Sequence, residues 1–252
     1  ENTEILEEHK ILAFDGDYND YFGKSLAIDG NWLVVGALYD NVNGEKSGSA
    51  YIYHYDDSNW HFHTKLIPPD GSPYDRFGYS IDIDDSHIVV GAVYDDDMGE
   101  DSGSVYVYSN ESDSWVLKTK LYSSNHQAGD FFGVSVSLNI NRLAVGAVYN
   151  DQNGTNSGSV TLFKYEDDWE EQQILLAPDG QEYDLFGNDI DIYNNRLIVG
   201  AFHKDDNYMN SGSVYIYTLL DDLFNFSFSL SSTDQSLNDN FGLSVSIFED
   251  FM

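Results

Sequence analysis

Large apolar residues alternate with small or polar residues along several short stretches of the chain. In Phe132–Leu138 every second residue is large and apolar, and glycine or serine stands between them. Phe22–Ile28 follows the same alternation, with one lysine at a large position. A period of two residues places the large side chains on one face of a strand. The pattern therefore predicts β-strands with one apolar face.

Three other kinds of apolar stretch follow each alternating one. The first is apolar at every position, which is typical of a strand covered on both faces; its copies are Leu33–Ala37, Ile88–Ala92, Leu143–Ala147 and Leu197–Ala201. The second begins at Ser-Gly-Ser and carries paired aromatic residues, such as Tyr51 and Tyr53. The third, exemplified by Trp60–Leu66 and Trp115–Leu121, is more polar and is predicted to be the outermost strand.

These stretches recur as a unit. Phe-Gly begins at residues 22, 77, 132, 186 and 241, with spacings of 55, 55, 54 and 55 residues, and Val-Gly-Ala and Ser-Gly-Ser recur in step with it. Four antiparallel strands per unit, stacked through apolar faces, are the blades of a β-propeller, and a solenoid is the alternative repeat architecture. We predict an all-β propeller, complete or partial, with four full blades of four strands over residues 22–66, 77–121, 132–176 and 186–230.

A partial fifth blade is predicted from the two ends of the sequence. Residues 241–252 begin another alternating strand, and residues 4–12 stand where a fourth strand would precede Phe22. Exposed blade faces and sheet edges are normally covered. We therefore expect further copies of the chain, or remaining blades of a longer chain, to supply the missing strands.

The acidic composition limits the partners. The formal net charge of −33 predicts that nucleic acids and anionic membranes are repelled, and no apolar run has the length of a membrane helix, so direct membrane insertion is not expected. The same charge is compatible with bound cations, basic partners or a salty exterior. There is no cysteine, so disulfides contribute nothing.

The combination of Phe-Gly-x-Ser, Val-Gly-Ala and Ser-Gly-Ser-x-Tyr-x-Tyr resembles the FG-GAP repeats, which form the blades of the integrin α-subunit propeller and of many microbial and protist surface proteins. The resemblance implies a β-propeller that serves extracellular binding or adhesion. Integrin-type units hold calcium between their first two strands, but here that connection is as short as Asp29–Asn31. The family's calcium site therefore does not transfer by position, and the units resemble the microbial subtype.

Acidic residues recur two and seven positions ahead of each Phe-Gly. We interpret them as structural loop carboxylates, because Asp and Asn hydrogen-bond nearby backbone N–H groups and fix turns. A hard cation held by the same oxygens is the alternative. These residues are Asp15, Asp20, Asp70, Asp75, Asp130, Asp179, Asp184, Asp234 and Asp239, with Asn125 at the equivalent place in the third unit.

The loops between the second and third strands of each unit are more acidic still. Adjacent carboxylates such as Asp95, Asp96 and Asp97 repel one another unless they are solvated or neutralised. Solvated loops are one interpretation, and bound calcium, which would raise the melting temperature, is the other. The candidate ligands are Asp40, Asn43, Asp95, Asp97, Asp151, Asn153, Asp205 and Asp206.

Little in the sequence points to catalysis, because the seven histidines share no repeat position and no nucleophile motif is present. We expect a non-catalytic extracellular or cell-surface scaffold or adhesion module that binds a protein or glycan through its blade loops. An accessory or catalytic propeller of a secreted hydrolase or lyase, and a subunit of a surface filament, are the alternatives. Asn110, Asn153 and Asn225 stand in sequons that could accept N-glycans if the chain is secreted, and the first two, in predicted loops, are the better candidates.

Overall fold

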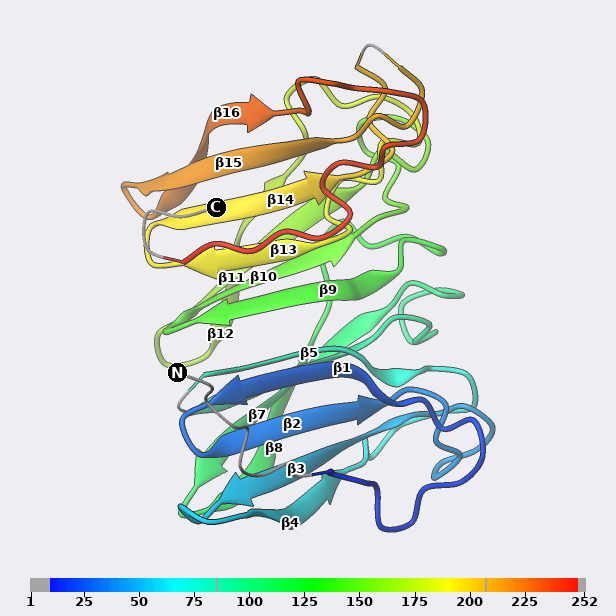
Figure 1. The fold of residues 1–252 in the computed structure, drawn as a ribbon, viewed down its shortest axis with the longest axis vertical. Coiled ribbons are helices and arrows are strands. Elements are labelled where there is room, and N and C mark those ends of the chain that lie inside the picture. The colour runs from blue at the N-terminus through cyan, green and yellow to red at the C-terminus, as the bar shows by residue number, and fades with distance from the viewer. Residues whose placement is uncertain (1–9, 85, 207, 249–252) are drawn as a thin grey trace, which may run out of the picture.

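The computed structural model describes residues 10–84, 86–206 and 208–248, and all their regular elements are strands (Figure 1). The first blade contains β1 (Phe22–Asp29), β2 (Trp32–Ala37), β3 (Ser49–Tyr55) and β4 (Trp60–Leu66). The second contains β5 (Phe77–Asp84), β6 (His87–Ala92), β7 (Ser104–Glu111) and β8 (Ser114–Leu121). The third contains β9 (Phe132–Asn139), β10 (Arg142–Ala147), β11 (Ser159–Tyr165) and β12 (Trp169–Leu175). The fourth contains β13 (Ile190–Tyr193), β14 (Arg196–Ala201), β15 (Ser213–Leu220) and β16 (Leu223–Leu230).

Each blade is a four-stranded antiparallel meander in which sequence neighbours pair. Successive blades meet through their first strands, β1, β5, β9 and β13, which follow one another along the inner side of the stack. The second strands β6, β10 and β14 are buried over almost their whole length, whereas β16 is largely exposed and β4 is only partly buried. The predicted all-β fold of four propeller blades is confirmed.

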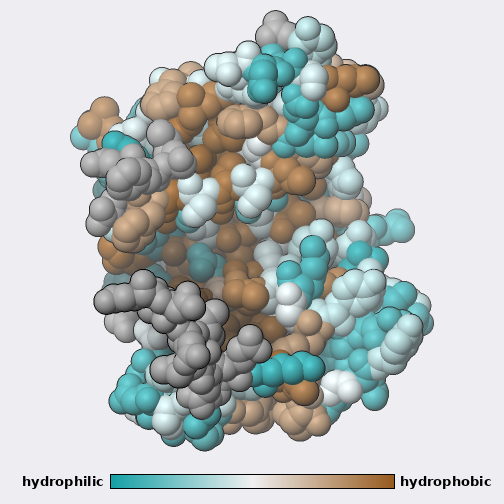
Figure 2. Space-filling view, viewed as in Figure 1, coloured by the Kyte–Doolittle hydropathy of each residue, from teal (hydrophilic) through white to brown (hydrophobic). Residues whose placement is uncertain are grey.

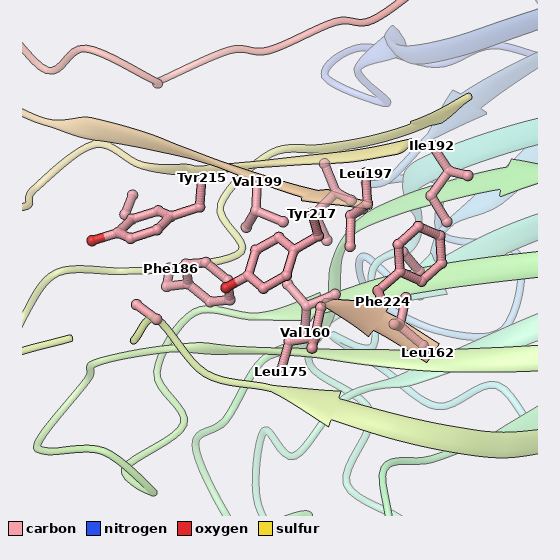
Figure 3. Packing of buried hydrophobic residues seen from close by; sticks show 14 residues of the cluster. Val160, Leu162, Leu175, Phe186, Ile192, Leu197, Val199, Tyr215, Tyr217 and Phe224 are labelled. Atoms are coloured by element: carbon pink, nitrogen blue, oxygen red, sulfur yellow. The ribbon is translucent and has the colours of Figure 1, made fainter. Parts of the chain in front are cut away.

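The hydrophobic core lies between the blades rather than within one of them. Figure 3 shows the contact between the third and fourth blades, where Val160 and Leu162 of β11 face Ile192 and Leu197 of the next blade. Phe186 of the Phe-Gly pair packs edge-on against the ring of Tyr215, with the ring centroids 5.4 Å apart. A blade therefore buries its apolar faces only against its neighbours.

The recurring glycines permit this close stacking. A Cβ atom on Gly91 would lie 2.2 Å from the carbonyl oxygen of Gly133 in the next blade, and Gly36, Gly146 and Gly200 meet their neighbours at 2.1–2.3 Å. The glycine of each Phe-Gly pair has a φ between +87° and +90°, a region in which residues with side chains are strained. Close approach therefore occurs at both motifs, since a Cβ on Gly78 or Gly187 would also lie 2.5–2.6 Å from a serine carbonyl oxygen, whereas positive φ is found at the Phe-Gly glycines and not at those of Val-Gly-Ala.

Hydrogen bonds from side chains hold the inner strands together. The Ser80 hydroxyl donates to the Gly133 carbonyl (2.6 Å), and the Asp82 carboxylate accepts from the Leu138 N–H (2.7 Å). In the next pair of blades the Ser137 hydroxyl accepts from the Ile192 N–H (3.0 Å). These bonds satisfy backbone groups that would otherwise stand unpaired at the edge of each sheet.

Equivalent positions are covered unequally along the stack. Leu26 and Ile28 on β1 are 63% and 58% exposed, whereas Ile81 and Ile83, their counterparts on β5, are 8% and 5% exposed. The difference arises because β5 is covered by the first blade, while no described blade covers β1.

Three details differ from the sequence prediction or lie outside the described residues. Residues 10–12, the described end of the strand predicted over residues 4–12, are not in a strand, although the Leu12 carbonyl accepts a hydrogen bond from the Tyr53 hydroxyl (3.1 Å). In the predicted fifth blade, Phe241 bridges to Gly212 and Ile247 packs on the fourth blade. Residues 4–9 and 249–252 lie outside the described residues.

The alternating strand predicted from Phe186 is shortened to β13, because Asn188 turns its amide to the carbonyl groups of Gly242 and Leu243.

Candidate functional site

Two sets of loops gather at one end of the blades, on the right in Figure 1. One set joins the second and third strands of each blade, and the other leads from each fourth strand to the next Phe-Gly pair. These loops contain every carboxylate and amide singled out as a candidate calcium ligand or structural loop carboxylate. The candidate site is therefore built at this end.

The carboxylates two positions before the phenylalanine each close a short turn. The Asp75 carboxylate accepts a hydrogen bond from the Ser72 N–H, three residues earlier (2.6 Å). The same bond is made by Asp20, Asp130, Asp184 and Asp239. An Asp in this role orders the loop backbone.

The carboxylates seven positions before the phenylalanine bind a tyrosine of the third strand. Asp70 accepts from the Tyr106 hydroxyl (2.8 Å), and Asp15 and Asp179 accept from Tyr51 and Tyr215 (both 2.7 Å). The third unit, which has Thr161 at the tyrosine position, carries an amide instead of the acid: Asn125 donates to Gln152. In the last copy, Asp234 accepts from the Ser232 hydroxyl.

A lysine ammonium occupies the centre of the acidic loops in the second blade. Lys120 Nζ lies 2.6 Å from Asp95, 2.6 Å from Asp97 and 3.0 Å from Asp70, and 4.8 Å from the centre of the Tyr106 ring. Burial opposes the charged form of Lys120, but the hydrogen bonds from its ammonium to Asp95 and Asp97 raise its pKa. We call this lysine with its surrounding carboxylates a lysine cage.

The first and fourth blades repeat the lysine cage with different residues. In the first, Lys65 Nζ lies 2.6 Å from Asp40 and 2.8 Å from Asp15. In the fourth, Ser229 stands at the position of Lys65 and Lys120, and the ammonium comes from Lys204, at the loop position of Asp40 and Asp95. Lys204 is 2% exposed, lies 3.3 Å from Asp184 and donates to the Asp179 carbonyl (2.8 Å).

In the third blade both charges of the cage are replaced together. Asn150 takes the loop position of Asp40 and Asp95, and Ile174 takes the position of the strand lysine. The Asn150 amide donates to the Asp130 carboxylate (3.0 Å). Lysine and loop carboxylate thus change together from blade to blade, which is expected if the ammonium serves to neutralise these loops.

The lysine cages do not fit calcium, because an ammonium already neutralises the carboxylates of Asp40, Asp95 and Asp97. The other candidate ligands bind loop backbone or a neighbouring side chain. The amides of Asn43 and Asn153 donate to the carbonyls of Pro68 and Ala177. The carboxylates of Asp151 and Asp205 accept from the N–H groups of Asn156 and Asn210, and that of Asp206 accepts from the Ser213 hydroxyl. Within residues 10–84, 86–206 and 208–248, no three His, Asp or Glu side chains are grouped to hold a metal ion. Calcium stays a prediction for Asn43, Asp151, Asn153, Asp205 and Asp206.

The three sequons lie in different settings. Asn110 is in β7 rather than in the predicted loop, because the strand continues to Glu111, and its side chain accepts from the Asp113 N–H. Asn153 lies in the loop between β10 and β11. Asn225 lies in β16 with an exposed side chain.

We expect the melting temperature to fall as the pH rises from about 4 to about 8. Burial raises the pKa of Asp75 to about 6 and that of Asp82 to about 7, from an ordinary value near 3.8. A carboxyl whose pKa is raised in the folded state binds its proton more tightly there, so its contribution is present below pH 3.8 and is lost as the pH passes the folded pKa. Thermal denaturation at several pH values measures this.

The Asp82→Asn variant should show a flatter pH dependence, because an amide oxygen can still accept from Leu138 and carries no proton to lose. Asp57→Asn, a change at an exposed position outside the inner strands, is the control. A melting temperature that rises steadily from pH 5 to pH 8 in the unmodified chain would contradict the expectation.

The turn before each Phe-Gly pair aims one side chain at the inner end of the blade. The residue before the phenylalanine has a φ of 56° to 58° at Arg76, Phe131 and Leu185. This left-handed conformation is energetically unfavourable for residues other than glycine, asparagine and aspartate. Backbone bonds to the previous loop hold them there, such as Phe131 N–H to the Asp101 carbonyl (3.2 Å). Tyr21 and Asn240 complete the series.

Two of these turn residues, Phe131 and Leu185, line a hollow of about 460 Å³, which we call the hub hollow. Every repeat contributes to it the residue after its Phe-Gly pair, and these five residues all differ: Lys24, Tyr79, Val134, Asn188 and Leu243. The remaining lining residues are Tyr94, Phe131, Val148, Tyr149, Leu185, Asp189, Phe202 and Ser244. Figure 2 shows hydrophobic residues on the floor of the recess between the two halves of the molecule.

Aromatic rings form a row beside the hub hollow. The Phe131 ring lies 4.6 Å from that of Tyr94 and 4.8 Å from that of Tyr149, and both pairs are tilted. In the preceding turn the guanidinium of Arg76 takes the place of the ring, 3.8 Å from the centre of Tyr94 and 5.2 Å from that of Tyr39. Tyr149 is 37% exposed, so part of this row faces solvent.

The family follows from the sequence of the repeats. The FG-GAP repeat profile matches residues 5–53, 60–108, 115–163 and 169–217. The chain belongs to the FG-GAP repeat family. No helix in the described part of this FG-GAP chain has the length and apolar character needed to cross a membrane.

Solved structures similar to this FG-GAP chain include Sqt1 of Saccharomyces cerevisiae, with 13% identity over 85% of the chain and a TM-score of 0.49. A hypothetical selenium-binding protein from Sulfolobus tokodaii matches with 8% identity over 80% of the chain and the same TM-score. The chain covers 49% and 52% of these two structures, about half their length. A search of curated proteins gave no match.

Proposed function

We propose that this FG-GAP chain is a non-catalytic binding module of an extracellular or cell-surface protein, and that it takes a protein or glycan partner at the loop end of its blades. The observation that carries the proposal is the hub hollow. Phenylalanine and glycine are the same in all five Phe-Gly pairs, yet the next residue is different in every copy, and these five residues converge on one hollow. If these five residues served only to pack the blades together, there would be no physical reason for them to differ from one copy to the next.

Backbone strain supports a binding role, because two of the strained turn residues, Phe131 and Leu185, line the hub hollow. The left-handed turn before each Phe-Gly pair is cheapest for glycine or asparagine, as at Asn240, but four copies carry Tyr21, Arg76, Phe131 and Leu185. Strain of this kind costs on the order of 1 kcal/mol per residue and is often retained at functional sites. The three sequons and the family's common use in adhesion support the extracellular location.

The test is binding to an immobilised panel of extracellular proteins and glycans, followed by mass spectrometry of the recovered ligand. A binding module releases its ligand with unchanged mass, and Tyr149→Ala weakens capture relative to Tyr18→Ala, a change to an exposed tyrosine outside the hub hollow. Recovery of a cleaved ligand would instead support a hydrolase or lyase, and equal capture by both variants would place binding elsewhere.

A further inference from the structure

The hub hollow has the size of a small-ligand site. Its volume of about 460 Å³ lies within the range of about 300–1,000 Å³ found for small-molecule pockets. A stable protein partner would instead require roughly 800 Å² of complementary surface on each side. The hollow therefore favours a compact group, such as one or two rings at the end of a larger molecule.

The lining of the hub hollow has two chemical characters. Tyr79, Tyr94, Phe131 and Tyr149 supply aromatic rings, whereas Lys24, Asp189 and Ser244 supply hydrogen-bonding groups. The Asn188 amide is already bound to the carbonyl groups of Gly242 and Leu243. Burial, together with the nearby Tyr94, raises the pKa of Tyr79, so its hydroxyl remains protonated and able to donate. A sugar ring has the same two characters, because its C–H face packs on aromatic rings and its hydroxyl groups exchange hydrogen bonds.

Charge narrows the class of sugar. The chain carries a net charge of −33, and the half-buried Asp189 carboxylate lines the hub hollow itself. A sialic or uronic acid would bring a further carboxylate into this field, and like charges brought together in a partly desolvated site repel. An uncharged sugar avoids that cost and still offers hydroxyl groups to Asp189.

We propose that the hub hollow binds an uncharged sugar residue of a glycan, stacked on the rings of Phe131 and Tyr149 and hydrogen-bonded by Asp189. This rests on the proposed function and names its ligand class. The proposal accounts for the large side chain in the left-handed turn at Phe131, because this strained backbone places the Phe131 ring in the lining of the hub hollow.

The experiment uses the whole chain and an array of glycans ending in uncharged sugars, including N-acetylated ones, beside matched glycans ending in sialic or uronic acids. Titration calorimetry with the best ligand then compares four proteins. Tyr149→Phe keeps the ring and should bind more tightly than Tyr149→Ala. Tyr149→Ala removes it and should weaken binding about 3- to 10-fold, while Tyr18→Ala should leave binding unchanged.

A second variant separates recognition from folding. Phe131→Asn places a residue suited to the left-handed turn, so its melting temperature should stay within about 2 °C of the unmodified chain while sugar binding is lost. Binding that survives this change overturns the proposal, as do preference for sialylated or uronic glycans and equal affinity of Tyr149→Ala and Tyr18→Ala.

The outcomes also distinguish this proposal from the broader function. If no uncharged glycan binds but a protein ligand does, and Tyr149→Ala weakens that complex, the sugar proposal is wrong and the proposed function as a binding module is supported. If the recovered glycan is shortened, the non-catalytic function falls as well.

Discussion

Replacing Gly91 with alanine should unfold the chain at a temperature about 10 °C lower than normal, through a loss on the order of 3–5 kcal/mol. The added Cβ would lie 2.2 Å from the Gly133 carbonyl oxygen and 2.4 Å from the Ser80 hydroxyl oxygen. The carbonyl belongs to the backbone of the next blade and cannot move without separating the two blades, and the Ser80 hydroxyl can move only by breaking its hydrogen bond to that carbonyl. Urea denaturation gives the free energy of unfolding.

Gly129→Ala is the control for this effect. Nothing lies within 4 Å of a Cβ at Gly129, but its φ of +83° is unfavourable for alanine and costs about 1 kcal/mol. If Gly91→Ala lowers the free energy of unfolding by no more than Gly129→Ala does, the blades do not approach each other closely at Gly91.

Replacing Lys120 with methionine should cost about 3–5 kcal/mol, because it leaves the carboxylates of the second lysine cage without their counter-charge. The side chains of Lys120 and Asp95 are only 12% and 3% exposed, so water cannot substitute for the ammonium. Lys118→Met is the matched control, since Lys118 on the same strand is 41% exposed in its pair with Glu111, and exposed pairs contribute at most about 1 kcal/mol.

A compensating change separates charge from packing at Lys120. Asn150 already replaces the loop carboxylate in the third blade, where Ile174 replaces the lysine. The double variant Lys120→Met with Asp95→Asn should therefore recover part of the stability that the single variant loses. Absence of any recovery would mean that the loss in Lys120→Met does not come from the unpaired Asp95 carboxylate.

The blade architecture could be predicted from the sequence because its physical causes are local and repeated. Alternation in Phe132–Leu138 fixes which face is buried, and four copies in one register leave few alternative folds. The exceptions fall where a local signal is overridden. Asn110 looks like a turn residue, but pairing with Trp115 extends β7 through it. The strand predicted from Phe186 is shortened by Asn188, which binds the following segment instead.

The lysine cages and the hub hollow were missed by sequence reasoning, although both leave a signal. Lys65 and Lys120 stand directly opposite Tyr51 and Tyr106 in neighbouring strands, and Lys204 replaces a loop acid where the strand lysine is absent. Comparing the units for positions that change together would have found them. The hub hollow needs the stacking angle of the blades, which brings together residues some 55 positions apart, and periodicity alone does not give that angle.

The unequal cover of equivalent strands also bears on dynamics. Burial of Leu26 and Ile28 contributes little to stability, whereas the first strand of each later blade is covered by the blade before it. Amide exchange should therefore be fastest in β1 and become slower in the blades towards the middle of the stack. The chain would then unfold locally from the first blade inward and not in one cooperative step.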